Sequence, residues 1–290
     1  MNRLMRLWTW SVAAASFVAI SLPALAQDPA AAAPGDTTAT RQLAPGVLKI
    51  VDPLQEAQDT VSRHDLTELL AVDPKFDWAK DVDFRRDIWG FVFSFKPLRM
   101  IDVDVPQADG RLARKQLWYL VYSVTNPGKA LHPVTTEDGT YDLETVDKPL
   151  RFVPEFVLYA PEFDRTYSDR VIPVAIGPIR TRERTPPLLS SVEIAREIQV
   201  GETLWGVATW EDIDPRIDRF SIFVYGLTNA YRWADKAGEY KPGDPIGKGR
   251  RLSRKALKIN FWRPGDEYFP HEKEIRLGIP GDVDYAWVFR

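Results

Sequence analysis

From Ile88 onward, apolar and polar residues alternate along most of the chain. Within 89–95 every odd position is aromatic, and within 101–105 three apolar residues alternate with Asp102 and Asp104. A period of two is typical of β-strands that bury one face and expose the other. We therefore predict strands in both segments, with Asp102 and Asp104 on the solvent face.

Strand-like patterns recur in six later segments: 117–125, 151–160, 203–210, 219–227, 255–263 and 283–289. The segment 219–227 is apolar on both faces apart from Ser221, so we expect it to be a central strand. No long stretch of helical periodicity separates these segments, which excludes a doubly wound α/β fold. The pattern predicts a mainly β fold, either a sandwich or a barrel.

Two of these strands end in similar six-residue sequences, 121–126 (VYSVTN) and 224–229 (VYGLTN). A strand that ends in Thr-Asn can turn there, because asparagine tolerates left-handed backbone and its side chain bonds the residues that follow. Six residues are too few to establish a domain repeat, and the intervening strands do not repeat. We therefore favour one domain over two.

Residues 47–87, before the first long strands, change to a helical pattern in short pieces. Asp52 supplies an N-cap, with Pro53 at the first helical position and Gln55 three residues after the cap. A second capping box pairs Asp65 with Glu68. Helices this short need tertiary contacts, so we predict a helical segment that packs on the β body.

The N-terminus has the pattern of a secretory signal peptide over residues 1–26. Arg3 and Arg6 precede an apolar run to Leu22, and the small residues of Ala24-Leu25-Ala26 suit cleavage before Gln27. An uncleaved membrane anchor is the competing interpretation, but the small-residue site favours removal. We expect no membrane span after cleavage, and residues 27–46, rich in Ala, Pro and Thr, to be a disordered linker.

Composition narrows the class of protein further. The absence of cysteine excludes disulfides, thiolate metal sites and a cysteine nucleophile. Signal cleavage removes two of 38 basic and none of 41 acidic residues, which changes the net charge from −3 to −5. A mildly acidic chain of this kind has no nucleic-acid footprint.

The order of motifs resembles a bacterial extracellular immunoglobulin-like domain over about residues 88–263. The shared features are the turn Asn126-Pro127-Gly128, the Gly201-Glu202 pair before a Gly206-Val207 strand, and the strong strand 219–227. The resemblance implies an immunoglobulin-like antiparallel β-sandwich, which we assign to 88–290 with a C-terminal extension.

Three longer stretches are similar to a group of exported proteins of planctomycete bacteria: 87–107, 206–233 and 260–290. That resemblance implies an envelope or secreted location, periplasmic or extracellular. It implies no activity and no site residues, because the group has no assigned function.

The histidines and the glycine-rich segment support no catalytic or nucleotide site. His271 opens a sequence that begins like a zinc-protease helix, but Ile275 stands where the second histidine ligand is needed. With three histidines in all, a serine-type triad is improbable. The segment 243–249 lacks the spacing and the Ser or Thr of a phosphate-binding loop. We expect no cofactor.

Carboxylates cluster at Asp102, Asp104 and Asp109, and again at Glu211, Asp212 and Asp214, and oxygen ligands of this kind are what calcium takes. Neither cluster fits a calcium-loop formula, so a calcium site at Glu211, Asp212 and Asp214 is a hypothesis. Paired carboxylates can also serve as glycosidase catalysts, which keeps a carboxylate-dependent hydrolase open as an alternative.

The connection from Asn229 to Ser253 is long for a compact domain, and long connections are often functional. It contains a local excess of positive charge beside aromatic residues, in an acidic chain. Such neighbours suit a glycan or an anionic polymer through stacking and charge-assisted hydrogen bonds, whereas the alternative is that the aromatics pack the loop onto the sheet edge. The candidate ligand-binding residues are Tyr231, Arg232, Trp233, Arg250 and Arg251.

The leading hypothesis is a non-enzymatic interaction or structural module of the cell envelope, with an envelope protein or a polysaccharide as partner. It follows from the strand pattern and from the missing catalytic groups. A carbohydrate-binding module that uses Tyr231, Trp233 and the basic residues of 229–253 is the first alternative, and the hydrolase is the second.

Overall fold

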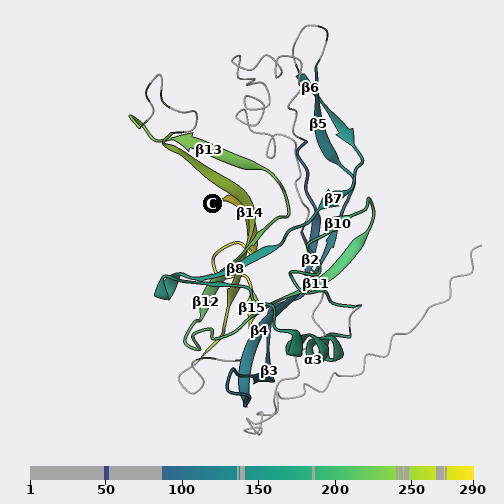
Figure 1. The fold of residues 1–290 in the computed structure, drawn as a ribbon. Helices are drawn as coiled ribbons and strands as arrows, with labels where there is room; N and C mark the ends of the chain where they lie inside the picture. Colours follow the sequence, from purple (N-terminus) through teal and green to yellow (C-terminus); the bar gives the residue numbers. More distant parts are fainter. Residues whose placement is uncertain are drawn as a thin grey trace, which may run out of the picture. The chain divides into compact units, whose positions relative to one another are not determined.

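The computed structural model describes residues 49–51, 87–135, 137, 141–184, 187–239, 241, 244, 248–265, 271 and 273–290. This part of the chain is mainly β, with one α-helix and four antiparallel sheets (Figure 1). The prediction of a mainly β, antiparallel fold is confirmed. The predicted signal peptide, the linker and most of the predicted helical segment lie outside the described residues.

A five-stranded sheet is built around one long strand, β4 (Leu112–Thr125). One edge of β4 pairs with β3 (Arg99–Pro106) and then with β2 (Val92–Phe95), and its other edge pairs with β11 (Thr203–Trp210). Strand β1 (Lys49–Val51) adds to β2. In β3, Asp102 and Asp104 are exposed while Val103 is buried, as the alternation predicts.

A seven-stranded sheet is built around β12 (Arg219–Tyr225) and β14 (Arg250–Trp262). β12 lies between β14 and β8 (Glu155–Ala160), which confirms that it is central, and β9 (Arg165–Ser168) follows at one edge. The remaining strands all pair with β14: β13 (Tyr231–Asp235), β15 (Arg276–Leu277) and β16 (Tyr285–Phe289).

The inward faces of these two sheets share one apolar core. The ring centroids of Tyr122 and Phe156 lie 4.7 Å apart, and those of Trp118 and Phe220 lie 5.1 Å apart, so aromatic pairs join β4 to strands of the other sheet. Such pairs add about 1 kcal/mol each beyond the area they bury. The period-two burial expected from the sequence therefore produces a common interior for both sheets.

Helix α3 (Pro173–Glu183) covers the outer face of the five-stranded sheet, where Ile179 packs with Tyr119 and Val207. The sequence analysis did not predict this helix. Gly177 and Pro178 interrupt its sequence, and its apolar residues form only a weak helical stripe. Pro173 at the helix start was the available local signal, because proline suits the first helical turn.

The C-terminal end of α3 places Glu183 in a buried polar cluster. Its carboxylate accepts hydrogen bonds from the Arg99 guanidinium at 3.0 Å, the Tyr119 hydroxyl at 2.7 Å and the Lys96 ammonium at 3.2 Å. The Glu183 side chain is 1% exposed. Burial and the neighbouring Glu183 charge raise the pKa of Tyr119 well above its usual range, so its hydroxyl stays protonated as a donor.

Two small two-stranded sheets complete the described fold. β5 (Ala130–Thr135) pairs with β6 (Tyr141–Val146), and β7 (Leu150–Arg151) pairs with β10 (Glu197–Ile198). A 3₁₀ turn, η2 (Pro161–Phe163), connects β8 to β9. The β5–β6 pair was not expected, because 130–146 lacks a clear apolar alternation.

The predicted helical segment 47–87 needs a correction at its start. Lys49–Val51 forms strand β1, in which Val51 is fully buried opposite Phe93. The β-branched pair Ile50-Val51 suits a strand, and pairing with β2 satisfies its backbone groups. The two predicted helices, after Asp52, lie outside the described residues.

Asn126 and Asn229, which end the two similar segments 121–126 and 224–229, form hydrogen bonds just after β4 and β12. Asn126 is fully buried, its Nδ2 donates to the carbonyls of Lys148 and Ile198, and its Oδ1 accepts from the Gly128 amide at 2.9 Å. Gly128 has a φ of 75°, so the predicted turn at 126–128 is confirmed. Asn229 instead bonds a distant segment: its Oδ1 accepts from the Trp89 amide and its Nδ2 donates to the Asp87 carbonyl.

No helix within the described residues combines the length and the apolar character needed to cross a membrane.

Candidate functional site

The prediction that residues 229–253 form a loop is wrong, because part of this range forms a β-hairpin. β13 pairs with the start of β14, with Tyr231 opposite Arg254 and Arg232 opposite Ser253. The hairpin continues β14 beyond the residues that pair with β12 (Figure 1). Aromatic residues at alternate positions were the missed strand signal. The consequence is that the candidate ligand residues sit on a sheet rather than on a free loop.

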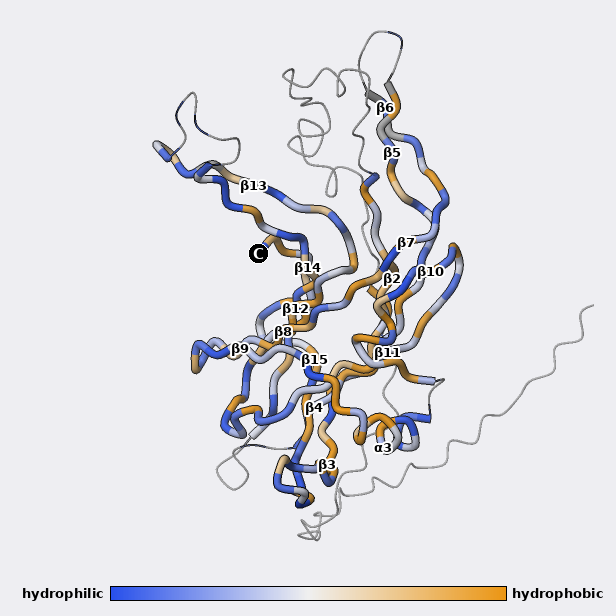
Figure 2. The backbone as a smooth tube through the Cα atoms, viewed as in Figure 1, coloured by the Kyte–Doolittle hydropathy of each residue, from blue (hydrophilic) through white to orange (hydrophobic). Residues whose placement is uncertain are grey.

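Most of the hairpin's side chains are polar or charged, and hydrophilic colours predominate along it in Figure 2. Arg232 and Arg251 are exposed, whereas Tyr231 and Arg250 are half-buried. Trp233 lies opposite Leu252 in the strand register, but its side chain is outside the description. The hypothesis that Trp233 binds a ligand therefore stays a prediction.

Strand β16 carries a row of three half-buried aromatic residues at alternate positions, Tyr285, Trp287 and Phe289. Alternate residues of a strand share one face and lie about 7 Å apart. We call this set the β16 row. It was visible in the sequence as a strand pattern, but not as part of a site.

Each ring of the β16 row lies against a cation. The Arg232 guanidinium stands 4.0 Å from the ring centroid of Phe289, and the Lys255 ammonium lies 5.6 Å from Phe289 and 5.9 Å from Trp287. Lys49 lies 5.4 Å from the Tyr285 ring. A cation over a ring face gains electrostatic attraction from the ring quadrupole. The register places Arg232 beside Ser253 and Lys255 opposite Phe289, so one face of β13, β14 and β16 carries the β16 row, Arg232 and Lys255, whereas Lys49 comes from β1.

The opposite face of the seven-stranded sheet has a similar arrangement, with the aromatic rings on β12. The Arg290 guanidinium lies 4.3 Å from the Phe223 ring, and the Arg254 guanidinium lies 4.6 Å from the Tyr225 ring. Arg254 also forms an ion pair with Glu155 at 2.8 Å. Phe223 and Tyr225 belong to a small apolar cluster on this outer face.

Several cations of this region have no acidic partner. Within the part of the chain that the structure describes, Arg232, Arg251 and Arg290 form no ion pair with a carboxylate. All three side chains are exposed. An exposed guanidinium that is not neutralised by the protein is available to an anionic ligand.

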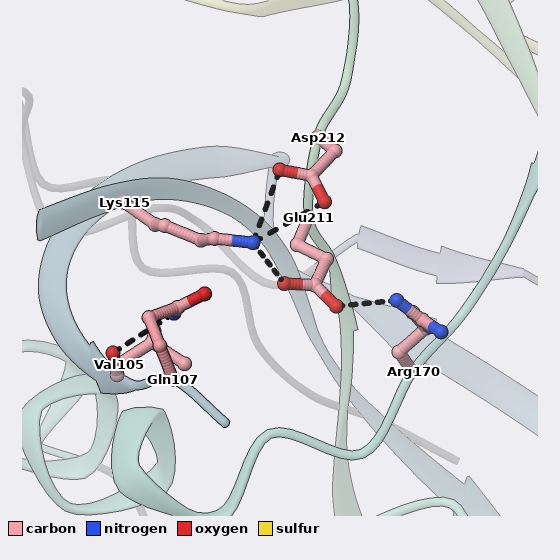
Figure 3. A network of polar contacts seen from close by, with 6 residues as sticks. All are labelled: Val105, Gln107, Lys115, Arg170, Glu211 and Asp212. Atoms are coloured by element: carbon pink, nitrogen blue, oxygen red, sulfur yellow. Dashed lines mark hydrogen bonds and ion pairs between the residues drawn. The ribbon is translucent and has the colours of Figure 1, made fainter. Parts of the chain in front are cut away.

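The candidate calcium ligands have a different environment, because each is held by cations of the chain. Glu211 pairs with Lys115 at 2.9 Å and also with Arg170, and Asp212 pairs with the same Lys115 at 3.2 Å (Figure 3). Asp214 pairs with Arg216 at 2.8 Å and with Arg165 at 3.5 Å.

These contacts lower the pKa values of Glu211 and Asp214. The hydrogen bond from Lys115, with Arg170 nearby, lowers the pKa of Glu211, and the hydrogen bond from Arg216 lowers that of Asp214. Among the described residues, no group of three or more His, Cys, Asp or Glu is arranged to hold a metal ion. The calcium hypothesis thus remains without geometric support.

We expect Glu211→Gln to lower the free energy of unfolding by about 1 kcal/mol at pH 7. A lowered folded-state pKa contributes stability above the usual glutamate pKa of about 4.3, and this contribution disappears as the pH falls through the folded value. The difference between wild type and variant should therefore shrink between about pH 5 and pH 3. Urea unfolding at several pH values measures it.

Asp212→Asn is the matched control, because its side chain is 68% exposed and asparagine tolerates its left-handed φ of 56°. It should change the stability less than Glu211→Gln. A Glu211→Gln deficit that is the same at pH 3 as at pH 7 would contradict the assigned ion pair. In the same assay, calcium should leave the midpoint unchanged, and an increase would restore the metal hypothesis.

The two described histidines each contact a carboxylate. His132 Nδ1 lies 2.6 Å from Asp87, which also pairs with Lys148, and His271 Nδ1 lies 2.9 Å from Asp218. The hydrogen bonds from Lys148 and His132 outweigh burial and lower the pKa of Asp87. These contacts join His132 of β5 to Asp87 and His271 to Asp218, the residue before β12, which is a structural role.

Comparisons of the chain with protein-family models, with curated proteins and with solved structures find no match.

Proposed function

We propose that this protein is a non-enzymatic binding module of the cell envelope, exported through its N-terminal signal. Its β-rich body would be an immunoglobulin-like sandwich, in which the two large sheets form the layers. The shared core of these sheets and the Asn126–Gly128 turn support this assignment. The sequence pattern of a signal peptide and the resemblance to exported planctomycete proteins support the location.

One observation carries the binding role: the seven-stranded sheet presents arginines, Arg232 and Arg290, that have aromatic partners and, among the described residues, no acidic ones. Such a surface attracts an anionic partner, even though the whole chain has a net charge of −3. A hydrolase that uses Glu211, Asp212 and Asp214 fits less well, because all three carboxylates are engaged by cations. Free carboxylates of suitable pKa are what that chemistry requires.

Binding of anionic polymers by the mature chain tests this role. We expect polygalacturonate and dextran sulfate to bind and uncharged dextran not to bind, with affinities that fall as salt rises because the charges are exposed. The double variant Arg232→Gln, Arg251→Gln should bind these polyanions about tenfold more weakly. Interferometry with immobilised polymer measures the affinities.

Arg114→Gln is the matched control, because Arg114 is an exposed arginine on β4 in the other sheet. It should retain the wild-type affinity. The role is refuted if no polyanion binds, if dextran binds equally well, or if the protein releases reducing ends from these polysaccharides.

A further inference from the structure

The Arg232–Phe289 pair differs from an ordinary surface cation, because the ring restricts the orientation of the guanidinium. The Arg232 guanidinium lies 4.0 Å from the Phe289 ring centroid and has no carboxylate partner among the described residues. A free arginine side chain loses about 2 kcal/mol of rotamer entropy when it is immobilised. Stacking on a ring imposes part of that restriction before a ligand arrives, which favours binding.

A guanidinium held in this way presents a planar set of N–H donors. Two parallel hydrogen bonds to one carboxylate or sulfate are stronger and more directional than a single charge contact. Lysine has the same charge but a compact ammonium, so it cannot form this pair of bonds. The geometry therefore implies recognition of a planar or tetrahedral oxyanion, rather than attraction to charge alone.

The neighbouring residues indicate which polymer carries the oxyanion. Trp287 and Tyr285 continue the β16 row from Phe289 and are half-buried, where they pack against the core that the two sheets share. A uronic or sulfated sugar has an apolar ring face beside its anionic group, which matches a ring beside an arginine. An acidic peptide carries its carboxylates on flexible stems and offers no such flat face.

We propose that Arg232 binds the carboxylate or sulfate of an acidic polysaccharide through two parallel hydrogen bonds, and that Phe289 is the positioning residue that orients Arg232. This inference rests on the proposed binding role and names the ligand class of the same surface. The half-buried Phe289 also contacts the sugar ring that carries the bound anion.

Charge-conserving and ring-removing variants test the inference. Arg232→Lys should weaken polygalacturonate binding about fivefold, nearly as much as Arg232→Gln, because both variants lose the two parallel hydrogen bonds of the guanidinium. Phe289→Leu retains apolar volume and the arginine, and it should weaken polygalacturonate binding about threefold. Poly-L-glutamate should bind wild type more weakly than polygalacturonate does and respond less than twofold to Phe289→Leu.

Phe163→Leu is the control for ring removal, because Phe163 also lies under an arginine, Arg216, at 5.0 Å, but it follows β8 at η2. It should leave binding unchanged, and thermal melts confirm that each variant is folded. If Arg232→Lys retains the full polygalacturonate affinity and Arg232→Gln loses it, the two parallel hydrogen bonds are not required. This result overturns the inference and leaves the binding role intact. Equal responses of poly-L-glutamate and polygalacturonate overturn the polysaccharide assignment, and absence of all polyanion binding overturns the proposed function itself.

Discussion

Replacing Glu183 with alanine should lower the free energy of unfolding by about 3–5 kcal/mol, the range for removing one partner of a buried ion pair. The substitution leaves the Arg99 guanidinium, 7% exposed, without its carboxylate, and it removes the acceptor of the buried Tyr119 hydroxyl. Because Glu183 ends α3, the contact between this helix and the five-stranded sheet should loosen as well. Urea unfolding at pH 7, followed by tryptophan fluorescence, measures the loss.

Glu144→Ala serves as the control, since Glu144 is exposed on β6 and should cost less than about 0.5 kcal/mol. Tyr119→Phe removes a single donor to Glu183 and should cost about 1–2 kcal/mol. The assigned cluster is wrong if Glu183→Ala is no more destabilising than Glu144→Ala.

Gly226→Ala should destabilise the fold about as much as Glu183→Ala does. The substitution introduces both an unfavourable backbone conformation and a steric clash. Gly226 has a φ of 85°, and a Cβ built on it would lie 2.1 Å from the Val153 carbonyl oxygen. A backbone oxygen cannot rotate away as a flexible side chain can, so β12 or the segment after β7 must shift. We expect a loss on the order of 3–5 kcal/mol, or failure to fold.

Gly238→Ala isolates the backbone effect from the steric one. Gly238 has nearly the same φ, 80°, but a Cβ there meets no atom within 4 Å. Its cost should be about 1 kcal/mol, the strain of a left-handed non-glycine residue. Thermal melts of the two variants compare them directly, and equal shifts would show that the contact with Val153 is not limiting.

Strand positions were the most predictable part of the fold. Phe91, Phe93 and Phe95 are all fully buried, and β12 is central, because alternation and continuous apolar runs report directly on which faces leave water. The same reasoning missed α3, where Gly177 and Pro178 weaken the local helical signal. That helix exists because it covers Tyr119 and Val207, which is a tertiary reason.

In the candidate site too, the sequence indicated the residues but not their structural partners. Arg232 was identified from its aromatic and cationic neighbours in the chain, but its structural partner is Phe289, 57 positions later and on another strand. Glu211 and Asp212 were proposed as calcium ligands because their neighbours along the chain are acidic. Lys115, almost a hundred residues earlier, pairs with both of them. Sequence spacing cannot reveal such partners, because strand register determines them.

The sequence by itself determined that this protein is a cysteine-free, mainly β chain. It also determined that Asp102 and Asp104 lie on the exposed face of a strand and that 219–227 contains a central strand. These properties follow from the solvation of each side chain, which depends on residue type and on the two-residue period of a strand. Only the tertiary structure decided that 231–235 is a strand, that α3 exists, and which cation faces which ring or carboxylate. Those contacts join residues far apart in the chain, so they depend on how strands pair and sheets pack.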